Sequence, residues 1–256
     1  MEDRKKAEIE YYDTQAKDFS ERSREAREGF SPSVLGSYQF LYKLAASLCE
    51  GKKVLDYGCG NGVHTAFLAK HAAEVVGVDL SENSLEIARK NAQKEGIGEK
   101  TKFLAMDCEA LEFPSGSFDV VFDGGTFSSL DFPKALGEIV RVLRPNGVLV
   151  GIETFGHNPL ANVKRAYNKI TGKRTAWAAS HIMRQKEIAL LRDHFEQIEL
   201  HYFHLISLFC FPFLGLPGGR FLLQLGQLID RAFLRVPFLE KYAFKVVFMC
   251  HGKKAG

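Results

Sequence analysis

The stretch Val54-Leu55-Asp56-Tyr57-Gly58-Cys59-Gly60-Asn61-Gly62 is an apolar segment that runs into a loop with glycine at every second position. Glycine at this density costs backbone entropy, and it suits a loop whose main chain must approach a ligand closely. The pattern therefore predicts a strand, a ligand-binding turn and then a helix. A tight strand-to-helix turn of purely structural use is the alternative interpretation.

An acid downstream of this loop narrows the class of ligand. Asp79 lies 17 residues after Gly62 at the end of the next apolar segment, where a carboxylate can accept hydrogen bonds from a ribose diol. The dinucleotide pattern G-x-G-x-x-G would place its third glycine at position 63, which is Val63 here. The spacing favours an adenosine-containing cofactor other than a dinucleotide, and a nucleotide-dependent oxidoreductase remains the alternative.

Short apolar runs alternate with segments of helical period, which predicts a sheet covered by helices on both faces. Ser81 is expected to cap a helix over 81–94, and Arg144-Pro145-Asn146-Gly147 is expected to form a turn before a strand. The other expected helices cover 132–143 and 186–194, and the expected strands cover 53–57, 74–78, 101–105, 118–122, 148–152, 197–203 and 244–250.

As a set, the glycine loop, Asp79, Met106-Asp107-Cys108, the run 118–123 and the turn before Val148 resemble the class I S-adenosylmethionine-dependent methyltransferases. The resemblance covers roughly residues 10–203 and 244–251. It implies an α/β, Rossmann-like sheet of seven strands whose last strand is antiparallel. It also implies S-adenosylmethionine as the cofactor.

The resemblance assigns roles to particular residues. Asp56, Gly58, Gly60 and Gly62 are expected around the methionine part of the cofactor, and Asp79 at the ribose. An N-terminal helix carrying Tyr11 and Tyr12 is similar to the one that many members with small substrates fold over the cofactor. The complete set of expected cofactor-binding residues is Tyr12, Asp56, Gly58, Cys59, Gly60, Gly62, Asp79, Leu80, Asp107, Cys108 and Asp123, with Asp107 and Cys108 along the adenine.

Two histidines are the predicted catalytic residues. Methyl transfer from a sulfonium requires alignment of the acceptor and, for many acceptors, removal of a proton. His157 follows the fifth expected strand, and His181 closes the same segment. Histidine has the pKa suited to this task, so we expect one of them to act as the base. The alternative for each is a surface or helix-capping histidine.

The formal net charge of +3 conceals an uneven distribution of charge. Residues 1–153 sum to −6, the segment 154–185 to +6, and residues 201–256 to +5. The basic insert 154–185 and the apolar, aromatic insert 204–240 are both longer than ordinary connections. The length predicts one domain, 1–256, with these two inserts as elaborations.

The inserts leave several partners open. The basic insert is interpreted as a solvated face or an RNA contact. The apolar insert is interpreted as an element at an anionic membrane surface, a hydrophobic lid over the acceptor, or a homodimer interface. We predict O- or C-methylation of a small, lipid-like acceptor, similar to the quinone and lipid biosynthesis methyltransferases. A non-catalytic S-adenosylmethionine-binding protein and an RNA-directed methyltransferase are the alternatives.

Composition and spacing weigh against other classes. Five scattered cysteines without C-x-x-C spacing predict neither a metal site nor disulfides. The charged N-terminus and the absence of about 18 uninterrupted apolar residues predict a cytoplasmic chain, peripheral to the membrane at most. Asp123-Gly124-Gly125-Thr126 lacks the Pro-Pro-aromatic motif of the enzymes that methylate DNA amines, which makes nucleic acid an unfavoured substrate.

Overall fold

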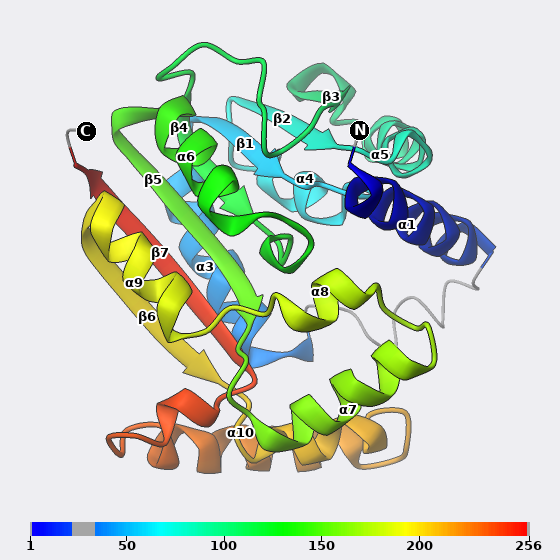
Figure 1. Cartoon of the computed structure of the whole chain (residues 1–256), viewed down its shortest axis with the longest axis vertical. Coiled ribbons are helices and arrows are strands. Elements are labelled where there is room, and N and C mark those ends of the chain that lie inside the picture. Colours follow the sequence, from blue (N-terminus) through cyan, green and yellow to red (C-terminus); the bar gives the residue numbers. More distant parts are fainter. Residues whose placement is uncertain (1, 22–33, 255–256) are drawn as a thin grey trace.

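Seven strands form one sheet, in the order β3-β2-β1-β4-β5-β7-β6, in the computed structural model, which describes residues 2–21 and 34–254 (Figure 1). Strands β1 to β5 run parallel, and β7 is antiparallel to both β5 and β6. This confirms the predicted seven-stranded class I fold. The strands are β1 (Lys53–Tyr57), β2 (Glu74–Asp79), β3 (Thr101–Ala105), β4 (Phe118–Asp123), β5 (Leu143–Thr154), β6 (Phe195–Phe203) and β7 (Lys245–Lys253).

One boundary differs from the sequence prediction. The segment Arg144-Pro145-Asn146-Gly147 does not precede the fifth strand but lies within its first part. The pairing of β4 with β5 shifts register there, from Phe118 opposite Leu143 to Val120 opposite Val148. The turn residues are therefore accommodated as an irregularity in a long strand.

Helices cover both faces of the sheet (Figure 1). Leu41 and Ala45 of α3 and Leu68 of α4 bury one face, and the helices α6 and α9 pack on the other. Ser81 caps α5 as predicted, because its side chain accepts the Ser84 amide. The helices are α1 (Asp3–Glu21), α3 (Gly36–Cys49), α4 (Val63–Leu68), α5 (Glu82–Lys94), α6 (Phe132–Val142), α7 (Pro159–Ile170), α8 (Ala176–Ser180), α9 (Gln185–His194) and α10 (Gly219–Phe233), with 3₁₀ turns η2 (Gly98–Lys100), η3 (Phe127–Ser129), η4 (Ser207–Phe213) and η5 (Glu240–Tyr242).

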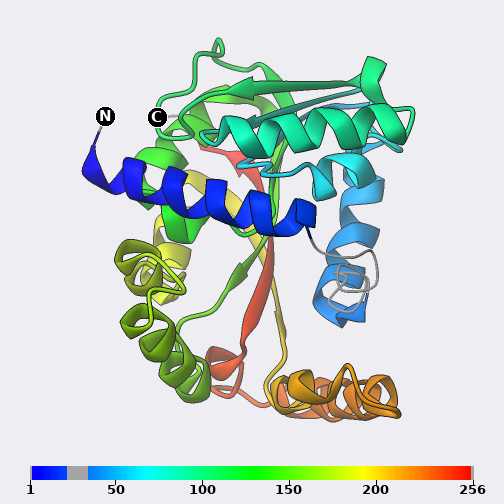
Figure 2. The ribbon, with the colours of Figure 1, turned by 90° about the vertical axis from the view of Figure 1, so that its right-hand side faces the viewer.

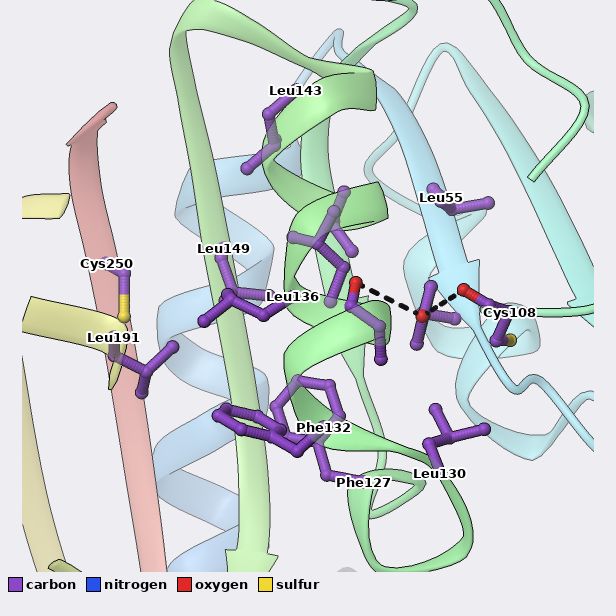
Figure 3. Close-up of a cluster of buried hydrophobic side chains, with 14 of the residues drawn as sticks. Leu55, Cys108, Phe127, Leu130, Phe132, Leu136, Leu143, Leu149, Leu191 and Cys250 are labelled. Atoms are coloured by element: carbon purple, nitrogen blue, oxygen red, sulfur yellow. Dashed lines mark hydrogen bonds between the residues drawn. The ribbon is translucent and has the colours of Figure 1, made fainter. Parts of the chain in front are cut away.

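The larger core lies between α6, α9 and the sheet (Figure 3). Its lower part in that view contains Phe127 and Phe132, whose rings meet edge to face at 4.9 Å. The buried hydroxyl of Tyr57 donates to the backbone carbonyl of Cys108, which is one of the dashed lines of Figure 3. This bond fixes the loop that follows β3 against the end of β1, so the core positions two chain segments at the carboxyl ends of the strands.

The apolar insert folds as η4 and α10. The faces of the two helices pack closely because Gly226 offers no side chain: a Cβ there would lie 3.0 Å from Ser207. Asp230 of α10 accepts the amides of Ile206 and Ser207 and so caps η4. His204 hydrogen-bonds both Ser207 and Ser37 of α3. The insert is thus anchored to the sheet-covering helix α3, and its α10 lies with α7 at one end of the molecule (Figures 1 and 2).

Gly62 carries two separable constraints, which a matched pair of variants tests. Its φ of +77° favours glycine, and an added Cβ would lie 2.9 Å from the Cβ of Ala88 in α5. Gly96 has a φ of +69° but no atom within 4 Å of such a Cβ. Gly96→Ala should cost about 1–2 kcal/mol of unfolding free energy from backbone strain alone. Gly62→Ala should cost clearly more in denaturant unfolding, and equal losses would contradict the packing constraint.

Candidate functional site

A cavity of about 240 Å³ lies at the carboxyl ends of β1, β2 and β4, under helix α1. It is lined by the loop after β1, by the acid that ends β2 and by the loop after β3. These are the segments that the sequence assigned to the cofactor. The predicted cofactor-binding residues that line it are Tyr12, Gly58, Gly60, Asp79, Leu80, Asp107 and Cys108.

The other predicted cofactor-binding residues lie behind this wall. Asp56 is buried and accepts the Thr65 hydroxyl at 2.5 Å. Burial raises its pKa to about 7, against the effect of that hydrogen bond. Cys59 is buried against Gly77, and Gly62 begins α4. These residues and Asp123 shape the glycine loop and its neighbours without lining the cavity.

Asp79 holds the glycine loop through backbone hydrogen bonds. Its two carboxylate oxygens accept the amides of Gly60 and Ser81, each at 2.9 Å. Burial nevertheless raises its pKa. The carboxylate therefore sits at the cavity wall with its position fixed by two loops, which suits a residue that must present an acceptor to a ligand hydroxyl.

Helix α1 closes the cavity through ion pairs with the loop after β3. Lys5 Nζ donates to Asp107 Oδ2 at 2.6 Å, and Arg4 donates to both carboxylate oxygens of Glu109 at 2.7 Å. Although burial opposes ionisation, the hydrogen bond from Arg4 lowers the pKa of Glu109 to about 2. Asp107, expected at the adenine, thus already has a protein partner on the cavity side.

The same helix contacts the basic insert. Glu8 accepts the hydroxyl of Thr175, which caps α8, and Arg4 lies 4.6 Å from the ring of Trp177. Arg174 donates to the hydroxyl of Tyr12 at 3.0 Å. Helix α1 therefore bridges the cofactor cavity and the start of α8.

The loop after β4 is held by two buried acids. Asp123 accepts the amides of Gly125 and Thr126, and Glu153 at the end of β5 accepts the amide of Phe127 at 2.7 Å. Burial, and then their mutual repulsion, raises the pKa of Asp123, and burial raises the pKa of Glu153. The acids fix the course of the backbone through Gly124 and Gly125.

A second cavity of about 810 Å³ begins at these two glycines. Gly124 and Gly125 line both cavities, so the two spaces meet at the loop after β4. The basic insert supplies one wall and η4 of the apolar insert supplies another. Its larger aliphatic and phenylalanine lining residues are Leu160, Ile182, Leu208, Phe209, Phe211 and Phe244.

Neither predicted base lines either cavity. His157 packs edge to face on Phe155 at 5.3 Å, and burial lowers its pKa. His181 stacks on Trp177 at 3.7 Å, and its Nδ1 lies 2.9 Å from the carbonyl oxygen of that residue. Among the described residues, the structure thus brings the predicted cofactor residues together but keeps both histidines apart from them.

Two of the titratable groups that line the cavities, one in each, were not predicted as site residues from the sequence. His64 lines the first cavity, its Nδ1 lies 2.9 Å from the Tyr42 hydroxyl, and burial lowers its pKa to about 4. Glu153 lines the second cavity. Their positions in the sequence could have identified them, because His64 follows the glycine loop and Glu153 lies at the end of an expected strand.

The family comparison agrees with this geometry. Residues 55–151 match the profile of the family described as "Methyltransferase domain". With the strand order and the antiparallel seventh strand, this match confirms the resemblance to the class I S-adenosylmethionine-dependent methyltransferases over residues 55–151. The cofactor of this family is S-adenosylmethionine.

Curated relatives match less than half of the chain. A demethylmenaquinone methyltransferase of Thermus thermophilus is 43% identical over 105 residues, which is 40% of this chain and 47% of the relative. A sterol 24-C-methyltransferase of Aspergillus fumigatus is 39% identical over 101 residues, or 39% of this chain and 27% of that protein. The chain thus spans about half the length, or less, of these relatives.

Solved structures share the fold over most of the chain. The phosphoethanolamine N-methyltransferase 2 of Haemonchus contortus, determined in complex with S-adenosyl-L-methionine, superposes with a TM-score of 0.60 at 19% identity. The superposition covers 86% of this chain and 54% of that one. At this identity the likeness establishes the fold alone.

The ion pairs of α1 lead to a prediction about cofactor binding. The double variant Arg4→Gln/Lys5→Gln should accelerate amide hydrogen exchange in α1 and weaken S-adenosylhomocysteine binding by about tenfold or more, because it removes charge-assisted hydrogen bonds. Lys6→Gln is the control, since Lys6 is exposed on the same helix. Unchanged exchange in the double variant would show that other contacts hold α1.

Proposed function

We propose that the protein transfers a methyl group from S-adenosylmethionine to an apolar, lipid-like acceptor, by O- or C-methylation. The observation that carries this proposal is the junction of the two cavities at Gly124 and Gly125. A cofactor in the first cavity and an acceptor in the second would meet there, which is the alignment that an in-line displacement needs.

The size and lining of the second cavity support the class of acceptor. Its volume of about 810 Å³ lies in the range of sites for small organic ligands. The two inserts supply most of its lining residues, and these include aliphatic and aromatic side chains such as Leu160, Phe209 and Phe211. The sterol and demethylmenaquinone methyltransferases among the relatives are named for apolar acceptors as well.

The cofactor half of this proposal is tested at Asp79. Asp79→Asn should weaken S-adenosylhomocysteine binding by about 10- to 100-fold in calorimetry, because a carboxylate that accepts ribose hydroxyls is replaced by an amide. Glu82→Gln is the matched control, since Glu82 is exposed at the start of α5. Unchanged affinity would remove Asp79 from the ribose, and binding of NAD in place of S-adenosylhomocysteine would overturn the cofactor assignment.

We also propose that this protein works at an anionic membrane surface. Among the described residues, no helix is long and apolar enough to cross a bilayer. Helix α10 instead presents an apolar outer face, with Phe221 71%, Leu225 45% and Leu228 61% exposed. Its turns and those of the following loop also carry Arg220, Arg231 and Arg235. Apolar side chains beside cations suit the interface of an anionic leaflet.

Helix α7 adds a second apolar stripe at the same end of the molecule (Figures 1 and 2). Val163 is 69% exposed and Ile170 is 84% exposed on this stripe. Leu160 of α7 and Phe209 of η4 are both exposed and both line the second cavity. Part of the lining of the second cavity therefore belongs to the same surface that we propose to contact the lipid.

Flotation with vesicles tests this placement. Wild-type protein should float at low salt with phosphatidylcholine vesicles that contain phosphatidylglycerol, and the variant Phe221→Ser/Leu225→Ser/Leu228→Ser should stay at the bottom. Gln224→Ser, an exposed polar change on the same helix, is the control. Wild-type protein that does not float would overturn the placement, as would a wild-type dimer that the triple variant converts to a monomer.

A further inference from the structure

We infer that the acceptor is an anionic amphiphile, whose carboxylate or phosphate is held by the cations of the second cavity while its apolar body lies against the two inserts. This inference rests on the proposed function and names the acceptor class within it. It depends on the charges that line the cavity, on their partners and on what surrounds them.

The lining of the second cavity is asymmetric in charge. Its cations are Lys164, Arg165, Arg174 and Lys245, and its acid is Glu153. Three of the cations come from α7 and the turn that follows it, and the fourth comes from the start of β7, which is far away in the sequence. Their convergence on one space concentrates positive potential where a ligand would bind.

None of these four cations forms an ion pair with a carboxylate among the described residues. Within the described residues, neither Arg165 nor Arg174 has a carboxylate oxygen within 4.0 Å of its guanidinium. Arg165 donates to Asn162 Oδ1 and to the carbonyl of Phe155. Arg174 donates to the hydroxyls of Tyr12, Ser128 and Ser129. Neutral acceptors orient these guanidinium groups, while the acids that attract them, Glu153 for Arg165 and Glu8 for Arg174, lie beyond ion-pair distance. Their positive charge is therefore only partly balanced, which is costly away from water.

The one acid of the cavity cannot balance them. Glu153 is 1% exposed, and its two oxygens already accept the amides of Phe127 and Thr154. A single carboxylate also carries one negative charge, whereas the four lining cations carry four positive charges. Among the described residues, Lys245 has only the Tyr38 hydroxyl, at 3.3 Å, as a hydrogen-bond partner, and its ammonium lies 5.1 Å from the centre of the Tyr38 ring.

Apolar side chains adjoin these cations and define the remainder of the ligand. Arg165 lies 6.0 Å from the ring centre of Phe244, and Phe211 meets that ring edge to face at 6.0 Å. Because Phe244 and Phe211 both line the cavity, an anion bound near Arg165 would have aromatic surface directly beside it. A free inorganic anion would leave that surface unused, whereas an amphiphile covers it.

Calorimetry on the protein saturated with S-adenosylhomocysteine tests the inference. The probes are dodecanoate, dodecyl phosphate, dodecanol and dodecyltrimethylammonium as monomers, which share one chain and differ in the head group. We expect one or both anionic probes to bind about tenfold or more tightly than dodecanol, and the cationic probe to bind most weakly. The ratio of dodecanoate to dodecyl phosphate distinguishes a carboxylate from a phosphate.

Variants of the lining cations test which residues cause the preference for anionic probes. Arg174→Gln and Lys245→Gln should each reduce the anionic preference by several-fold, and Arg165→Gln should do the same if it folds, as judged by circular dichroism. Lys169→Gln, an exposed cation of α7 outside the cavity, should leave it unchanged. Equal binding of dodecanol and the anions, or an anionic preference that survives Arg174→Gln and Lys245→Gln, would overturn the inference. Failure of the wild-type protein to bind S-adenosylhomocysteine would instead overturn the proposed function.

Discussion

The loop after β4 depends on two buried acids, and the two cavities depend on that loop. Asp123 and Glu153 end neighbouring strands and accept consecutive amides of one short segment. The Thr126 hydroxyl in turn donates to the carbonyl of Tyr57, at the end of β1. Three strand ends are thus tied together around Gly124 and Gly125. Burying two carboxyl groups side by side is costly, and backbone amides offset that cost.

The class of protein and its fold could be predicted from local sequence patterns, because each strand and turn is specified by residues that are adjacent in the sequence. The glycine loop, Asp79 and the capping Ser81 lie where their spacing predicts. The amide of Gly60 donates to Asp79 and the amide of Ser84 donates to Ser81, and both bonds close over short sequence distances. The pairing of Lys5 with Asp107 joins groups 102 positions apart. No local pattern encodes such a contact, so the closing helix was anticipated only loosely, through Tyr12.

The histidines illustrate the limit of reasoning from position. A residue after a strand is expected near the carboxyl end of a parallel sheet, but its side-chain direction depends on the next turn. Asn158 caps α7 by accepting the Ala161 amide and donates to the carbonyl of Tyr242. The chain therefore turns at Asn158, and His157 packs on Phe155. The cavity wall is reached instead by Glu153, which precedes the turn and is still part of the strand.

Helix α1 touches both halves of the site, and this has a thermodynamic consequence. One side binds Asp107 and Ser81 through Lys5 and Asp13, and the other meets the basic insert through Tyr12 and Arg174. A ligand that binds in the first cavity and shifts this helix would also change the free energy of the contacts between the helix and the basic insert. Donor and acceptor affinities are then linked reciprocally, so that each ligand alters the binding of the other by the same factor.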